Sequence, residues 1–122
     1  MSEKKFSKQH EWALIDGEVA TIGITKHASE MLGDVVFVEL PNIDDEFSQN
    51  DVFGTIEAVK TLADLYIPVS AKIIEINETL EDQPELVNSD PYNDGWIVKI
   101  ELSDISELDS LLDLDSYNEL IS

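Results

Sequence analysis

Short apolar runs separated by turn residues and acidic stretches continue along the whole chain. Residues 19–24 read as a strand, and the turn at Asp16-Gly17 pairs them with residues 11–15. Further strands are predicted over residues 35–40, 52–59, 62–69, 73–76 and 96–102. Many short strands bounded by turns favour a mainly β fold, either a sandwich or a flattened barrel.

Helices are predicted only at the edges of this pattern. Thr25 is a suitable N-cap for a short helix that runs to about Met31 and ends near Gly33. Residues 42–50 form an acidic loop, and two prolines exclude a continuous helix over residues 77–94. From residue 103 onward the apolar residues return to helical spacing. No linker interrupts the pattern, so residues 1–122 are expected to form one domain with small peripheral and C-terminal helices.

The charge balance is strongly acidic. The 122 residues include 27 acidic side chains against 7 basic ones, for a formal net charge of −20, and no arginine is present. Such a surface repels nucleic acid and anionic membranes and attracts partners that have basic docking faces. Acidity also serves solubility alone, so the charge by itself does not choose between these interpretations.

The composition also restricts the chemistry. The chain has no cysteine, which excludes disulfides, thiol catalysis and zinc–thiolate sites, so redox chemistry requires an attached group. Two histidines, His10 and His27, without an H-E-x-x-H pattern predict no metal site. The apolar runs are too short to span a membrane and the first residues resemble neither a signal nor a transit peptide. A cytoplasmic monomer is expected.

One segment carries a candidate site. Two β-prone runs meet at Lys60, which places this lysine at the exposed tip of a hairpin, where its stem is suited to becoming an amide-linked arm. Glu57 and Asp64 flank the tip and are positioned to guide a modifying enzyme or a cationic arm. From spacing alone, however, a solvated surface lysine is the favoured interpretation.

A resemblance changes this balance. Residues 57–60 (EAVK) and 64–70 (DLYIPVS) resemble the lipoylation motif of the glycine cleavage H-protein family. The resemblance extends in order through residues 10–12 (HEW), 20–25 (ATIGIT), 32–41 (LGDVVFVELP), 84–88 (PELVN), 90–92 (DPY) and 95–100 (GWIVKI). It therefore spans nearly the whole chain.

Three positions depart from the family pattern. Ala58 stands where serine is frequent, Thr61 where alanine is common, and Ala71 replaces a glycine. Ala71 indicates that this turn adopts an ordinary backbone conformation, because a positive φ would favour glycine. The lysine and its acidic neighbours are retained.

The resemblance implies a lipoyl/biotinyl-carrier-like fold with lipoic acid attached covalently to Lys60. In this family the arm accepts an aminomethyl group at the pyridoxal-phosphate P protein and delivers it to the folate-dependent T protein. Dihydrolipoyl dehydrogenase then reoxidises the arm, and lipoate-attaching enzymes install it. The carrier has no catalytic residues and is not an enzyme.

The loaded arm carries a cationic amine, which needs carboxylates or carbonyl oxygens nearby. Glu11 and Asp64 are the candidates from family position and chemistry, with the alternative that both are ordinary solvated acids. Trp12 and Trp96 are expected to belong to the core.

Other functions stay open at this point. A lipoyl domain of a 2-oxoacid dehydrogenase usually has aspartate before its lysine, and a biotin carrier has methionine on both sides; here Val59 and Thr61 flank Lys60. A relative that donates lipoyl groups to other proteins is not separated from the glycine cleavage carrier. An enzyme with paired carboxylates lacks a nucleophile or base motif, and an acidic interaction protein remains if Lys60 is unmodified.

Overall fold

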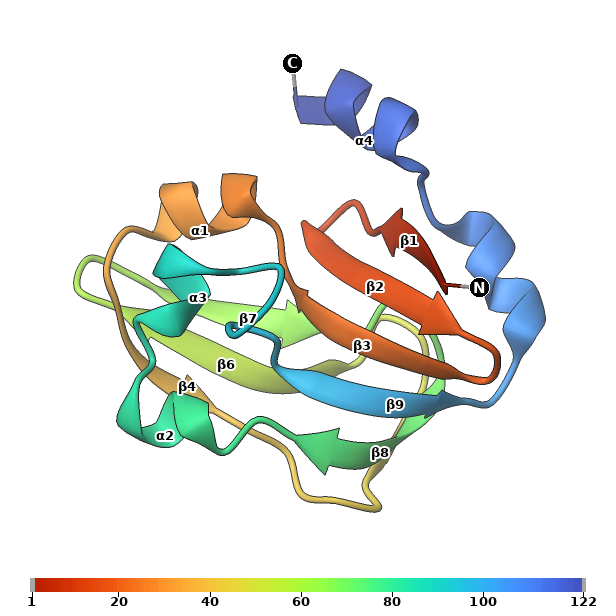
Figure 1. Cartoon of the computed structure of the whole chain (residues 1–122), viewed down its shortest axis with the longest axis horizontal. Coiled ribbons are helices and arrows are strands. Elements are labelled where there is room, and N and C mark those ends of the chain that lie inside the picture. The colour runs from red at the N-terminus through yellow and green to blue at the C-terminus, as the bar shows by residue number, and fades with distance from the viewer. Residues whose placement is uncertain (1, 122) are drawn as a thin grey trace.

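The computed structural model describes residues 2–121 and contains two antiparallel sheets (Figure 1). The larger sheet has, in spatial order, β1 (Ser2–Phe6), β2 (Glu11–Asp16), β3 (Val19–Ile24), β9 (Val98–Leu102), β8 (Ala71–Ile76) and β5 (Glu46–Phe47). The smaller sheet has β4 (Val35–Glu39), β6 (Val52–Ala58) and β7 (Leu62–Tyr66). The predicted mainly β class is confirmed. Because the two sheets do not close into a barrel, the sandwich describes the fold better.

Short helices connect and flank the sheets. They are α1 (Lys26–Leu32), α2 (Thr79–Asp82), α3 (Leu86–Ser89), the 3₁₀ helix η1 (Ile105–Ser110) and α4 (Leu114–Ile121). The predicted limits of α1 are confirmed, since Thr25 Oγ1 accepts a hydrogen bond from the Ala28 amide at 3.2 Å and Gly33 follows with φ of 78°. Within residues 2–121 no helix is both long and apolar enough to cross a bilayer.

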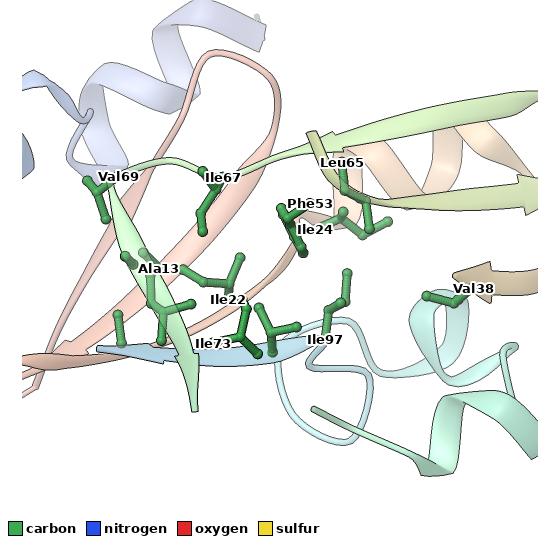
Figure 2. Packing of buried hydrophobic residues seen from close by; sticks show 14 of the residues in the cluster. Ala13, Ile22, Ile24, Val38, Phe53, Leu65, Ile67, Val69, Ile73 and Ile97 are labelled. Atoms are coloured by element: carbon green, nitrogen blue, oxygen red, sulfur yellow. The ribbon is translucent and has the colours of Figure 1, made fainter. Parts of the chain in front are cut away.

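The core lies between the two sheets (Figure 2). Buried side chains of both sheets form one cluster, which includes Ile22 and Ile73 from the larger sheet and Val38 and Leu65 from the smaller one (Figure 2). Ile97, just before β9, is fully buried in the same cluster. This packing holds the β6–β7 hairpin against the rest of the molecule.

Several elements differ from the sequence predictions. The strand predicted over residues 62–69 ends at Tyr66, and the polar segment over residues 77–94 contains the short helices α2 and α3. β1 was not predicted, because it is a polar edge strand that depends on backbone pairing with β2 rather than on apolar side chains. The acidic loop over residues 42–50 contains β5, which pairs with β8. The helix expected from residue 103 breaks into η1 and α4, because Phe6 and Leu112 exchange backbone hydrogen bonds of 2.8 and 2.7 Å and keep the chain extended there.

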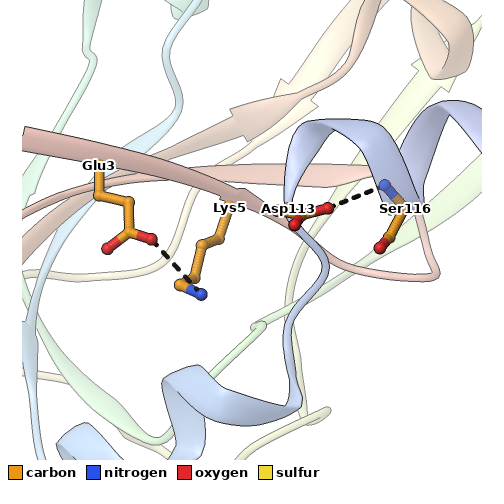
Figure 3. Close-up of polar contacts among 4 residues, drawn as sticks. All are labelled: Glu3, Lys5, Asp113 and Ser116. Carbon is orange, nitrogen blue, oxygen red and sulfur yellow. Dashed lines mark hydrogen bonds and ion pairs between the residues drawn. The ribbon is translucent and has the colours of Figure 1, made fainter.

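The segment after this break packs onto the N-terminal strands. Asp113 caps α4 by accepting a hydrogen bond from the Ser116 amide at 2.8 Å, and nearby Lys5 pairs with Glu3 at 3.6 Å (Figure 3). The Tyr117 ring stacks on Phe6 with 4.8 Å between the centroids. Phe6, Trp12 and Tyr117 thereby form a second small core.

Candidate functional site

The β6–β7 hairpin presents Lys60 at its tip. Leu62 pairs with Glu57 at the end of the strands, and the Ala58 amide donates to the Thr61 carbonyl at 2.8 Å across the turn. The Val59 amide donates to the Asp34 carbonyl at 3.0 Å, which ties the turn to the chain before β4. The Lys60 side chain is exposed. The predicted position of this lysine at an exposed hairpin tip is therefore correct.

The backbone of Gly33 lies next to the Lys60 side chain. A Cβ atom placed on Gly33 would lie 3.3 Å from Lys60 Cε, so the lysine stem rests against a position that has no side chain. Asn88 braces this backbone, because its Nδ2 donates to the Gly33 carbonyl at 2.7 Å and its Oδ1 accepts from the Val35 amide at 2.8 Å. Gly33 and Asn88 both lie in segments that resemble the family, but the sequence indicated Gly33 only as a helix end and gave Asn88 no role.

A small pocket of about 110 Å³ lies between residues 9–11, α1 and β7. Its walls are largely apolar. They consist of Gln9, His10, Glu11, Ile24, Ala28, Met31, Leu32, Ile56, Ala63, Asp64 and Leu65. α1 ends at Leu32, next to Gly33, and β7 begins at Leu62 after the turn, so both elements run from the pocket lining to the segment around Lys60.

Glu11 is the buried acid of the pocket, with only 2% of its surface exposed. The Ser7 hydroxyl donates to Glu11 Oε1 at 2.5 Å and the Tyr66 amide approaches Oε2 at 3.4 Å. Burial raises the pKa of Glu11 to about 7, and these hydrogen bonds offset only part of the shift. Near neutral pH this carboxyl is therefore divided between its neutral and charged forms, and an incoming cation favours the charged one.

The three acidic residues predicted for the site, Glu11, Glu57 and Asp64, lie in different environments. Glu11 and Asp64 both line the pocket, so the interpretation of Glu11 as an ordinary solvated acid is wrong. Glu57 is exposed beside Leu62 and does not line it. Trp12 is buried as predicted, whereas Trp96 is only partly buried against the second core. Ser7, which holds Glu11, carried no signal in the sequence.

A chain of polar groups, the polar junction, adjoins the pocket and consists of His10, Thr25 and Tyr117. The Tyr117 hydroxyl bonds to His10 Nδ1 at 2.9 Å and to Thr25 Oγ1 at 2.6 Å. His10 has a positive φ of 70°, and burial and then the neighbouring His27 lower its pKa. Within residues 2–121 no three metal-ligating side chains lie together. The junction joins α4 to the N-terminal strands.

Comparison with known proteins gives a consistent result. The sequence model of the family described as "Glycine cleavage H-protein" matches residues 4–122. Glycine cleavage system H proteins of Staphylococcus epidermidis and Staphylococcus haemolyticus are 58% and 57% identical over 120 residues, covering 98% of this chain and 95% of theirs. The crystal structure of a glycine cleavage system H protein from Mycobacterium marinum superposes with a TM-score of 0.88 at 32% identity, covering 96% of this chain and 94% of that one.

Proposed function

The chain belongs to the glycine cleavage H-protein family, and from this membership we propose that it carries lipoic acid in amide linkage on Lys60. As a family member it is a carrier component of the glycine cleavage system rather than one of its enzymes. The observation that carries the proposal is the exposed Lys60 at the hairpin tip, inside a sequence that resembles the family's lipoylation motif. The cytoplasm remains the expected location.

The residues around Lys60 fit such a group. The amine is exposed, and within residues 2–121 it forms no salt bridge, so nothing has to be broken before acylation. Gly33 leaves room along the lysine stem. The pocket formed with α1 and β7 offers apolar side chains together with Glu11. An arm that is both apolar and, when loaded, cationic suits this combination.

The protein's own residues have limited tasks in this proposal. When attached, the lipoyl group supplies the disulfide–dithiol chemistry and the sulfur that accepts the aminomethyl group. Ile24, Ala28 and Met31 shield the reactive end from water. Glu11 provides the counter-charge for an ammonium group, and Asp64 supplies a second carboxylate at the same pocket. Glu57, which lies outside the pocket, is left for contact with partners.

We further propose that the arm serves the P protein, the T protein and dihydrolipoyl dehydrogenase in turn. A carrier must meet several active sites, and an exposed lysine at a hairpin tip allows this without unfolding. The surface net charge of −20 favours partners that have basic docking faces over nucleic acid or anionic membranes. Monomeric behaviour is expected, since a free tip is needed for each encounter.

The test is intact mass and peptide mapping of the protein co-expressed with a lipoate ligase in the presence of lipoate. A mass gain of one lipoyl group mapped to Lys60 is expected. The matched control is Lys60→Arg, which keeps the charge and has no acylatable amine. The modified protein is then expected to support carbon dioxide release from glycine by P protein, and Lys60→Arg is not.

Two outcomes would contradict the proposal. One is a Lys60 that stays unmodified under these conditions. The other is a modification mapped to any of the remaining lysines with equal occupancy, which would mean that the hairpin tip is not selected. Circular dichroism of Lys60→Arg provides the folding control, with an unchanged melting temperature expected because the side chain is exposed.

A further inference from the structure

Exposed apolar side chains gather beside Lys60 on the outer face of the smaller sheet. Phe37 is 49% exposed, Leu62 65% and Val59 75%, which are large values for apolar residues that flank a single lysine. Val36 is also exposed, at the register shift between Val35 and Phe37. We refer to Phe37, Glu57, Val59 and Leu62 as the tip face. Grouped exposed apolar residues, unlike scattered ones, mark contact surfaces.

The pairing of the strands makes this face continuous. Phe37 is in register with Glu57, and Glu57 with Leu62, so one row of side chains crosses β4, β6 and β7 on the same face. Val38 and Ile56, the next residues along, are fully buried and point to the core. The row of Phe37, Glu57 and Leu62 therefore lies on the outer surface of the smaller sheet, opposite the core.

Acidic groups surround the apolar centre. Glu57 lies within the row, Glu39 follows on β4, and Asp34 precedes β4, where its carbonyl holds the Val59 amide. All three side chains are exposed, and among residues 2–121 none of them forms a salt bridge. A complementary partner has an apolar patch bordered by lysines or arginines.

We propose that the tip face is the docking surface for the enzyme that acylates Lys60, and that this enzyme presents a basic-rimmed apolar patch to Phe37 and Leu62. The proposal rests on the lipoyl carrier function. Acylation joins Lys60 Nζ to the acyl carbon of an activated lipoyl group, breaks that carbon's bond to the activating leaving group, and releases one proton from the amine. The activated acyl donor is supplied by the enzyme.

Reach favours this partner over the enzymes that use the finished arm. An acylating enzyme must bring its active site to the bare lysine, so its surface necessarily covers the residues within one side-chain length of Lys60. Enzymes that act on the far end of the completed arm work farther from the lysine and are free to dock elsewhere. Val59 lies in the turn next to Lys60, and Leu62 begins β7 directly after the turn, so both are close to the lysine along the chain.

The test measures kcat/KM for lipoylation by purified lipoate–protein ligase with lipoate and Mg-ATP, followed by intact mass. Leu62→Ser and Phe37→Ser remove the apolar centre, whereas Ile43→Ser and Ile105→Ser change side chains of similar exposure, 51% each, outside the tip face. We expect each tip-face variant to lower kcat/KM about tenfold or more. The two control variants are expected to match the wild type.

Two further measurements separate docking from other effects. Chemical acetylation of Lys60 by an N-hydroxysuccinimide ester, mapped by mass, is expected to proceed equally in all variants, because it needs no docking. Circular dichroism checks that each variant folds. Raising the salt concentration is expected to slow enzymatic lipoylation of the wild type, and Glu57→Gln is expected to weaken that salt dependence.

Several results would overturn the inference. Equal kcat/KM for tip-face and control variants would do so while leaving the carrier function intact. Equal slowing of chemical and enzymatic acylation would assign the effect to the lysine itself. Normal lipoylation combined with slower P-protein turnover would assign the face to a different partner. A wild-type Lys60 that the ligase does not modify would overturn the proposed function and this inference together.

Discussion

The β6–β7 hairpin and the polar junction of His10, Thr25 and Tyr117 are both polar features of a small β-protein, but they are assembled over very different distances along the chain. The hairpin is closed by the Ala58 and Thr61 backbone groups, three positions apart, and its lysine is exposed. The junction links His10 and Tyr117 across 107 residues and is partly buried. The hairpin thus exposes a lysine amine for modification at little cost in folding stability. The junction instead contributes hydrogen bonds to folding stability and exposes no reactive group. This contrast separates positions where substitution changes function from positions where it changes folding.

The largest effect is expected at Tyr117. Replacing it with alanine removes the stacking on Phe6 and leaves His10 and Thr25 without their shared partner, at a cost of about 3 kcal/mol. Urea unfolding measures the loss, and hydrogen exchange is expected to show α4 opening first. Lipoylation of Lys60 is expected to be unchanged. Tyr117→Phe is the control and is expected to lose only the hydroxyl contacts, about 1 kcal/mol. Slower lipoylation of folded Tyr117→Ala would contradict the conclusion that the junction affects folding and not the reactivity of Lys60.

A slightly smaller effect is expected at Glu11, and it depends on pH. Because the folded pKa of about 7 lies above the ordinary value of 4.5, its contribution to stability is fully present below pH 4.5 and is lost as pH rises through 7. Glu11→Gln is therefore expected to be more stable than the wild type at pH 8 by up to about 3 kcal/mol, with the difference shrinking toward pH 5. Urea unfolding between pH 5 and pH 8 measures this. Exposed Glu57→Gln serves as the control, and a pH-independent difference for Glu11→Gln would contradict the burial argument.

The hairpin region gives a third, smaller prediction at Gly33. Alanine there must adopt a φ of 78° and places its Cβ 3.3 Å from Lys60 Cε, so a loss of about 1–2 kcal/mol and a shifted lysine stem are expected. Thermal melting measures the first, and the rate of chemical acetylation at Lys60 measures the second. Gly17→Ala is the matched control, because Gly17 has a similar φ of 67° with no atom near its Cβ position. If Gly17→Ala alters acetylation equally, the contact with Lys60 is not the cause.

The smallest effect concerns protonation of His10. Burial lowers its pKa, so its contribution to stability is present above the ordinary value of 6.5 and is lost as pH falls through the folded value. The His27 ring lies 4.9 Å from the His10 ring, and the Tyr117 hydroxyl bonds to His10 Nδ1. Lys26 and Glu30 line a neighbouring pocket together with His27 and Tyr117. Asparagine tolerates the positive φ of this position, so His10→Asn is expected to fold and to lack the loss of stability that the wild type shows as the pH falls. The measured quantity is the difference in unfolding free energy between variant and wild type, taken at pH 7.5 and again at pH 5.5. Glu11 is present in both proteins, so its contribution cancels in this difference. A constant difference would show that His10 does not titrate within the junction.

The hairpin could be predicted because all of its determinants are local. Alternating strands, turn residues and the motif around Lys60 lie within residues 52–69, and local pairing fixes which side chains share a face. Thr25 and Gly33 identified α1 for the same reason, since helix caps act within one turn. The exposed row of Phe37 and Leu62 was not predicted, because it depends on the register of three strands.

The pocket and the junction could be predicted only in part. Glu11 and Asp64 were proposed from family position, but no pattern in the sequence indicated that Glu11 would be buried or held by Ser7. The break between η1 and α4 arises from pairing of Leu112 with Phe6, a contact that helical periodicity cannot anticipate. Such features depend on tertiary contacts, and intrinsic propensity yields to these.

The dependence of the second core on Tyr117 has a consequence for synthesis of the protein. On the ribosome, Phe6 and Trp12 are made early, but the residue that covers them follows 107 positions after His10. At ordinary elongation rates of about 5–20 residues per second, the aromatic face of β1 and β2 stays uncovered for roughly 5–20 seconds. A nascent chain stalled before residue 117 therefore exposes this aromatic surface to chaperones, whereas the β6–β7 hairpin has already left the exit tunnel and is able to form.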